Sequence, residues 1–271
     1  MDGKQLIQSL RAGERVYGTC IQSASPKWPG VVKNLGIDMV FIETEHTPQN
    51  REMVSWMCQA YSALDLAPVV RIPAPDPYQA QMVLDGGAHG IIAPYIETVE
   101  QVRSVGGAVK FGPLKGRKLQ QALDGELELE DEVVDYLGKR SQHKALFVNI
   151  ESVPALEALD DILSEPYIDA VLVGPHDLSI NLGIPEQYEH PEFERAINTI
   201  ISKSRANGIG VGIHHPSVDY QIKWAKAGAN LTMHSTDIYA FSKAMTSDLN
   251  TIRAALKDEA VVEMDSDSVT V

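Results

Sequence analysis

Two short apolar runs, Ala-Leu-Phe-Val-Asn-Ile-Glu at residues 145–151 and Ala-Val-Leu-Val-Gly-Pro-His-Asp at residues 170–177, indicate the fold of this chain. Short runs of branched and aromatic residues between polar stretches are typical of buried strands. The first run ends at Glu151 and the second leads to Asp177. One strand-plus-helix unit separates them, so we expect parallel strands whose carboxylates leave the core at the same edge. Two carboxylates there predict a divalent-metal site.

The same alternation of apolar runs and amphipathic segments recurs along the whole chain. The predicted strands are 16–23, 39–45, 68–73, 90–96, 145–151, 170–174, 208–214 and 231–234. The strands are apolar on both faces, which favours a parallel sheet covered by helices, such as those predicted over 50–64 and 191–207. About eight such units without an internal linker predict an α/β protein with a single (β/α)8 TIM barrel.

We assign the barrel to residues 1–257 and expect a flexible acidic tail over 258–271. A final helix over 237–256 is expected to close the barrel. The rival architecture is a doubly wound open sheet, which would need a glycine-rich phosphate loop after an early strand. The glycine-rich segment 86–90 instead follows a helical run over 78–84 and is interpreted as a helix end. No organic cofactor is predicted.

Composition excludes several classes of function. The net charge of −14 over 271 residues argues against nucleic acid, whose phosphates attract clustered Lys and Arg. No stretch approaches the roughly 20 apolar residues of a membrane helix, and residues 1–16 lack the apolar segment of a signal peptide. Cys20 and Cys58 are the only cysteines, and we expect buried free thiols in a reducing cytoplasm, with a disulfide between them as the alternative.

Functional groups of a parallel barrel collect at the carboxyl ends of its strands. The residues predicted at this rim are Glu45, His46, Arg71, Glu151, Asp177, His214 and His215. His46 suits a general base or a buried structural histidine, and Arg71 should pair with a carboxylate of the protein or of a substrate. For Glu151 and Asp177 the alternative to metal binding is capping of the following helices.

Five motifs along residues 16–255 together resemble the HpcH/HpaI family of class II pyruvate aldolases. They are Glu-Thr-Glu-His-Thr-Pro at 43–48, Pro-Val-Val-Arg at 68–71, Leu-Asp-Gly-Gly-Ala at 84–88, Asn-Ile-Glu-Ser at 149–152 and Gly-Pro-His-Asp-Leu-Ser at 174–179. The resemblance implies a lyase that cleaves a 4-hydroxy-2-oxo acid to pyruvate and an aldehyde, reversibly, through a pyruvate enolate. It also implies a homohexamer built as a trimer of dimers.

By this resemblance Glu151 and Asp177 are the ligands of Mg²⁺, Mn²⁺ or Co²⁺. Arg71 stabilises the keto oxygen, and His46 is the base, acting through a metal-bound water. Asp85 is its acidic partner, reaching from a neighbouring subunit; without the resemblance it is simply a turn former at a helix end. The implied substrate contacts are Arg71, Asn149, Gly174, Pro175 and His176. No Schiff-base lysine is required.

The chain departs from the family pattern at several positions. Glu43 replaces an aspartate of many relatives, and Asn149 replaces a glutamine. The loop at 112–118 is altered, so Lys115 and Arg117 are candidate contacts of the aldehyde. His214 and His215 are further candidates for acceptor contacts, with ordinary loop packing as the alternative.

Three rival functions remain at this stage. The same metal and enolate site suits decarboxylation of oxaloacetate or a macrophomate-synthase-like reaction that traps the enolate with a second substrate. An acyl-CoA lyase would need a basic groove for nucleotide phosphates, which the acidic composition disfavours. A barrel that binds a 2-oxo acid without catalysis is the third alternative, because fold alone does not define function.

Overall fold

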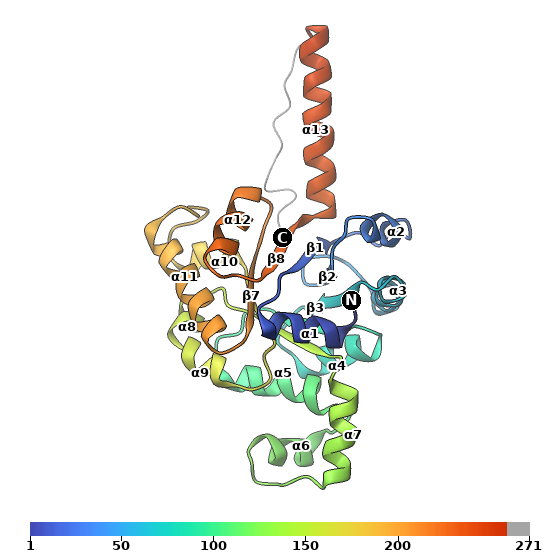
Figure 1. Ribbon diagram of the computed structural model, residues 1–271, viewed down its shortest axis with the longest axis vertical. Helices are drawn as coiled ribbons and strands as arrows, with labels where there is room; N and C mark the ends of the chain where they lie inside the picture. The colour runs from blue at the N-terminus through green and yellow to red at the C-terminus, as the bar shows by residue number, and fades with distance from the viewer. Residues whose placement is uncertain (259–271) are drawn as a thin grey trace.

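Eight parallel strands close into a barrel within residues 1–258, the part of the chain that the computed structural model describes (Figure 1). The strands are β1 Val16–Ile21, β2 Met39–Glu43, β3 Ala67–Arg71, β4 Gly90–Ala93, β5 Ala145–Asn149, β6 Ala170–Val173, β7 Gly210–His215 and β8 Leu231–Thr236. Each strand pairs with the next along the chain, and β8 pairs with β1. The predicted (β/α)8 barrel is therefore confirmed.

Helices follow or link the strands. They are α1 Gly3–Ala12, α2 Trp28–Lys33, α3 Arg51–Ser62, α4 Pro77–Asp85, α5 Val99–Phe111, α6 Gly116–Leu123, α7 Asp131–Ser141, α8 Val153–Glu157, α9 Leu159–Ser164, α10 Pro175–Asn181, α11 Pro191–Ala206, α12 Val218–Lys226 and α13 Asp237–Leu256. Several begin at a side chain that accepts a hydrogen bond from a backbone N–H in the first turn, among them Asn50, Asp76, Thr98, Ser152 and Ser217.

Most of the predicted strands begin within two residues of their observed starts but end earlier than expected. β2 ends at Glu43 and β5 ends at Asn149, two residues before the predicted ends. Glu45 and Glu151 therefore lie on the loops that leave the barrel rather than on the strands. This position frees their side chains from the regular alternation of the sheet while keeping them at the rim.

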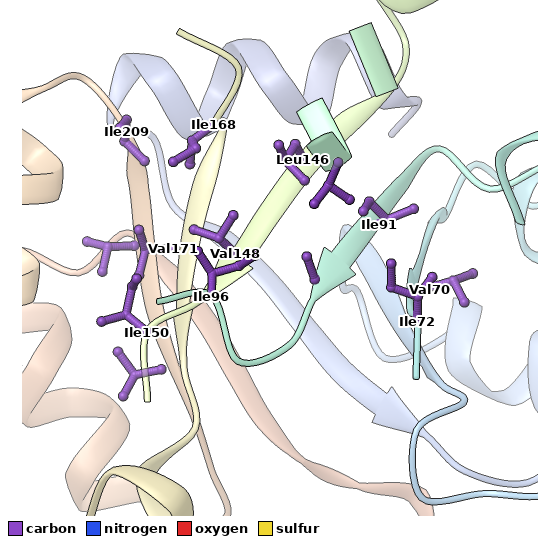
Figure 2. Close-up of a cluster of buried hydrophobic side chains, with 14 of the residues drawn as sticks. Val70, Ile72, Ile91, Ile96, Leu146, Val148, Ile150, Ile168, Val171 and Ile209 are labelled. Carbon is purple, nitrogen blue, oxygen red and sulfur yellow. The ribbon is translucent and has the colours of Figure 1, made fainter. Parts of the chain in front are cut away.

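The core has two layers because successive strand residues point to opposite faces. Alternate residues fill the barrel interior, including Phe41, Phe147 and Met233. Leu6 and Leu10 of α1 join this inner layer and close the amino end of the barrel. The intervening residues pack outward against the helices, as Figure 2 shows for a cluster that includes Val70, Ile91, Leu146, Val148 and Val171.

A buried carboxylate links four elements at the amino end of the barrel. Asp169, just before β6, is 1% exposed and accepts hydrogen bonds from Arg11 Nε at 3.0 Å and Lys110 Nζ at 2.6 Å. It also accepts the backbone N–H of Leu146 in β5 at 2.9 Å. Asp169 thus connects α1, α5, β5 and β6.

The expectation that the last helix closes the barrel is wrong. α13 has the predicted bounds, but it does not cover the barrel: it projects away from the strands (Figure 1), and Asp237 is its one buried residue within the described chain. The reason is geometric. β8 ends at Thr236 and α13 begins at the next residue, so no loop lets the helix turn back along the sheet. Of the predicted tail, residues 259–271 lie outside the described part.

Two further expectations concern thiols and membranes. Cys20 and Cys58 are both buried and free, as predicted. Among residues 1–258, no helix combines the length and the apolar character that a membrane span requires.

Replacing Asp169 with alanine is expected to lower the free energy of unfolding by about 3–5 kcal/mol, because the buried ammonium group of Lys110 would lose its carboxylate counter-charge. Urea denaturation measures this change. Asp160→Ala is the control, because Asp160 pairs with Lys203 on the surface with a side chain that is 74% exposed, and such pairs contribute about 0–1 kcal/mol. Equal effects of the two substitutions would contradict the role assigned to Asp169.

Candidate active site

Arg71 and Glu43 form the base of a cluster at the carboxyl end of the barrel. Glu43 ends β2, Arg71 ends β3, and the two residues are paired in the sheet register. Nη2 of Arg71 lies 2.5 Å from Glu43 Oε2, and its Nε lies 3.1 Å from Glu45 Oε2. The guanidinium also lies over the ring of Phe41, 5.2 Å from its centroid. Arg71 is buried, so two carboxylates and an aromatic face compensate its charge.

Glu43 also shapes the loop that carries His46. Its Oε1 accepts the backbone N–H of Glu45 at 2.5 Å and of His46 at 3.0 Å. One fully buried carboxylate therefore orients both the guanidinium and the turn that follows β2. The side chain of Glu43 is one methylene longer than that of aspartate, and it contacts both the Arg71 guanidinium and the backbone of this turn.

His46 has an acidic neighbour within its own chain. Its Nε2 lies 3.7 Å from Glu45 Oε2, and its side chain is 56% exposed. The alternative of a buried structural histidine is therefore wrong. Burial raises the pKa of Glu45, while Arg71 and His46 act in the opposite direction. Glu45 thus connects the solvent-accessible imidazole to the buried guanidinium.

The second half of the site is built around the Glu151 carboxylate, which is 3% exposed. Oε1 accepts the backbone N–H of Tyr95 at 2.8 Å, and Oε2 accepts Nδ2 of Asn149 at 2.9 Å. Gly174 leaves room for this group, because a Cβ there would lie 2.1 Å from Oε2. Burial raises the pKa of Glu151 to about 7, the two hydrogen bonds oppose this, and the negative charge of Asp177 adds to it.

These residues fit a divalent cation. Asp177 lies in the first turn of α10, whose start has no side-chain capping hydrogen bond, so capping does not account for it. Oδ1 of Asn149 is buried without a hydrogen-bond partner in the described chain. Residues 1–258 hold no cluster of three or more His, Cys, Asp or Glu side chains that could bind a metal. Mg²⁺ commonly takes one or two carboxylates and completes its shell with water and substrate oxygens, which matches this pair.

Two other predicted substrate contacts lie at the start of α10. Gly174 and Pro175 precede Asp177 and adjoin the Glu151 carboxylate through Gly174. His176 is exposed and its Nδ1 lies 3.7 Å from Glu186 Oε1, so the structure turns it toward the loop after α10.

Two predicted site residues, Asp85 and Lys115, lie at the far ends of the helices that descend from the rim, whereas Arg117 lines a cavity on the outer face with Pro77 and Glu100. Asp85 is the last residue of α4, which runs down to the amino end of β4, and its charge acts on nearby Lys144, just before β5. Lys115 and Arg117 follow α5, whose Lys110 binds the carbonyl of Lys144 at 2.7 Å. The structure does not bring Asp85 or Lys115 to the rim of their own chain.

The two neighbouring histidines of β7 differ in environment. His214 points into the barrel mouth, with its ring 5.6 Å from that of Phe41, and its Nε2 lies 3.0 Å from the carbonyl oxygen of Ser235. Burial lowers the pKa of His214 to about 4, so the ring is neutral and its Nε2 donates to that carbonyl. His215 packs outward against Tyr188 and Tyr220, which matches the alternative of ordinary packing.

Sequence reasoning did not assign roles to Glu45 or Tyr95. Glu45 could have been identified as a candidate, because it adjoins His46 and closely follows the acidic end of β2. Tyr95 supplies a backbone N–H to Glu151 from a left-handed conformation, with φ of 50°. Its hydroxyl accepts a hydrogen bond from Nδ2 of Asn181, the last residue of α10, at 2.9 Å. No local pattern signals that geometry.

The chain is similar to known proteins over most of its length. A family model described as HpcH/HpaI aldolase/citrate lyase matches residues 17–242. A 2-keto-3-deoxy-L-rhamnonate aldolase of Salmonella gallinarum is 30% identical over 242 residues, covering 89% of this chain and 90% of that protein. A solved HpcH/HpaI aldolase/citrate lyase family protein of Burkholderia cenocepacia is 26% identical with a TM-score of 0.80, covering 92% and 99% of the two chains. The citrate synthase SbnG is 25% identical with a TM-score of 0.80, covering 93% and 99%.

We expect the stability of the metal-free protein to fall between about pH 4.5 and 7, because the pKa of Glu151 is raised from 4.5 to about 7. In that window the folded state keeps a proton that the unfolded state releases, so rising pH favours unfolding, by up to about 3 kcal/mol. Glu151→Gln cannot ionise and should lose this dependence.

Urea unfolding at pH 5 and pH 8, with a chelator present, measures the difference between the two proteins. Adding Mg²⁺ at pH 8 should stabilise the unsubstituted protein more than Glu151→Gln, because a cation compensates the ionised carboxylate. Parallel pH dependences for both proteins would contradict the assignment.

Proposed function

Because this chain belongs to the HpcH/HpaI aldolase/citrate lyase family, we propose that it is a metal-dependent aldolase. The family makes it a carbon–carbon lyase, and the proposal adds the substrate and the mechanism. It would cleave a 4-hydroxy-2-oxo acid to pyruvate and an aldehyde, and also run in reverse. The observation that carries this proposal is the buried Glu151 carboxylate beside Asp177, at the same rim as Arg71, Glu45 and His46.

Glu151 and Asp177 would hold Mg²⁺, Mn²⁺ or Co²⁺. When bound, such a dication binds the oxygens of a 2-oxo acid and stabilises negative charge on the keto oxygen. No organic cofactor is part of the proposal. Asn149 supports this arrangement by donating to Glu151 while its Oδ1 stays available to the site.

Arg71 and His46 would carry the remaining chemistry. Removal of the proton from the C4 hydroxyl by His46 lets the C3–C4 bond break, which releases the aldehyde and leaves its electron pair on an enolate. The Arg71 guanidinium, held rigidly by Glu43 and Glu45, stabilises the charge of that enolate. Protonation at C3 then gives pyruvate. Glu45 supports the imidazolium that His46 becomes.

A 2-keto-3-deoxy sugar acid is the first substrate to test. The Salmonella relative is named a 2-keto-3-deoxy-L-rhamnonate aldolase, and cleavage of such an acid between C3 and C4 would release pyruvate and an aldehyde. The neutral His214 in the barrel mouth would contact the aldehyde portion, because its Nδ1 is left as a hydrogen-bond acceptor.

The proposal also includes an oligomeric state and a cellular compartment. Asp85 and Lys115 lie at the amino end of their own barrel, so they would reach a rim only in an oligomer, and a hexamer built as a trimer of dimers is proposed. The two free cysteines suit the cytoplasm.

Exchange of the pyruvate methyl protons in D₂O, followed by NMR, tests the enolate without knowledge of the aldehyde. We expect exchange that stops on metal removal and returns with Mg²⁺, Mn²⁺ or Co²⁺. His46→Ala should slow it by about 10²–10⁴-fold, as for loss of a general base. His143→Ala, an exposed histidine at the other end of the barrel, is the matched control. Absence of exchange with every metal would refute the aldolase proposal.

Comparison of substrates then separates aldol cleavage from decarboxylation. We expect kcat/KM for 2-keto-3-deoxy sugar acids to exceed that for oxaloacetate by at least about tenfold, a difference of about 1.4 kcal/mol in transition-state stabilisation. Coupled assays for pyruvate measure both reactions. The reverse order would assign the site to oxaloacetate decarboxylation or to a related reaction that traps the enolate.

A further inference from the structure

Asn181, the last residue of α10, joins this helix to two neighbouring segments through both ends of its amide. Its Nδ2 donates to the hydroxyl of Tyr95, in the loop after β4, at 2.9 Å. Its Oδ1 accepts the backbone N–H of Val153, at the start of α8, at 3.2 Å. A single side chain therefore connects the segments that leave the rim after β4, β5 and β6.

Two of these segments carry the proposed metal ligands. Asp177 lies four residues before Asn181, so the two side chains occupy the same face of α10, one turn apart. Glu151 lies two residues before Val153, and its carboxylate adjoins the start of α10 at Gly174. The segment after β5 thus meets α10 at both ends of the helix.

Tyr95 links the same parts of the site from the loop after β4. Its backbone N–H donates to Glu151 Oε1 at 2.8 Å, while its hydroxyl, at the other end of the residue, accepts from Asn181. Its φ of 50° is unfavourable for a bulky non-glycine residue and persists only where surrounding contacts hold it. Burial raises the pKa of Tyr95, and the negative charges of Asp177 and Glu151 add to this effect, so its hydroxyl lies within electrostatic reach of both carboxylates.

α10 is too short to hold its own orientation. It has seven residues, and helices of this length are marginal in water unless tertiary contacts stabilise them. Leu178 anchors one face in the core, whereas Asp177 and Asn181 lie on a face that is partly open to solvent. The two hydrogen bonds of Asn181 therefore fix the face of the helix from which Asp177 projects.

We propose that Asn181 is a positioning residue of the metal site, which sets the separation of the Asp177 and Glu151 carboxylates through its bonds to Tyr95 and Val153. The inference rests on the proposed function, because it requires that these carboxylates bind a divalent cation. Mg²⁺ requires ligand oxygens about 2.0–2.1 Å from the ion in a nearly ideal octahedron. A carboxylate that is free to move must be ordered when the ion binds, which weakens binding. Asn181 acts on the ion only through the carboxylates that it holds in place.

Titration of the metal-free protein with Mn²⁺, followed by electron paramagnetic resonance of the free ion, measures this role. We expect Asn181→Ala to weaken Mn²⁺ binding by about tenfold and Tyr95→Phe by about threefold, because they remove two hydrogen bonds and one. The double variant should bind no more weakly than Asn181→Ala alone, since both substitutions remove the same bond. Asn198→Ala is the matched control and should bind Mn²⁺ normally, because its exposed amide donates to Glu194 within its own helix.

The outcomes separate the positioning role from the metal site itself. Asn181 and Tyr95 are exposed, so the variants should keep their fold, which circular dichroism checks. Glu151→Gln should weaken Mn²⁺ binding far more than Asn181→Ala does, and raising Mg²⁺ should restore pyruvate exchange in Asn181→Ala. An unsubstituted chain that binds no Mn²⁺ would refute both the proposed function and this inference. Binding that Glu151→Gln removes and Asn181→Ala leaves unchanged would refute the positioning role alone, as would additive effects of Asn181→Ala and Tyr95→Phe.

Discussion

The contact between Arg71 and Glu43 is the interaction on which the rim of this barrel depends. The two residues end neighbouring strands in register, so the sheet itself brings guanidinium and carboxylate together. Burial makes each charge costly alone and makes the pair mutually required, since breaking such a pair typically costs about 3–5 kcal/mol. Glu43 uses its second oxygen to hold the backbone of the turn that carries Glu45 and His46. The position of the proposed base is therefore coupled to that of the proposed electrophilic group.

The half of the site that contains Glu151 and Asp177 differs from the Arg71 half, because its buried negative charge is not paired with a cation. Glu151 is buried like Glu43, but its neighbours are an amide, a backbone N–H and another carboxylate rather than a paired cation. A raised pKa is the physical sign of that imbalance. A bound dication would remove it, whereas the paired Arg71 needs nothing further. In the proposed mechanism the two halves would separate the tasks of holding a metal and of stabilising substrate charge, and sites with such perturbed groups are typical of enzymes.

Much of this arrangement could be predicted from local patterns. Strands that are apolar on both faces, such as residues 145–149, carry a signal that does not depend on distant contacts, and parallel topology then assigns their carboxyl ends to one rim. The limits are equally physical. Asp85 and Lys115 come from motifs near the site in sequence, yet α4 and α5 carry them to the amino end of the barrel. Glu45 was available as the neighbour of His46, but the ion pair with Arg71 that orients it joins the loop after β2 to the end of β3.

The sequence by itself determined the barrel, its strand order and the identity of the acidic, basic and imidazole groups at the rim, because these follow from hydrophobic periodicity and from motifs that are contiguous in the chain. Only the tertiary structure decided which groups share a neighbourhood: Glu45 with His46 and Arg71, Tyr95 with Glu151, and Asp169 with Arg11 and Lys110. It also decided the direction of α13. Amphipathic spacing predicts a helix that must cover an apolar surface, but the direction of that helix depends on the caps and hydrogen bonds at its first turn. Long-range contacts of this kind leave no periodic trace in a sequence, since they join residues whose separation along the chain is set by the fold.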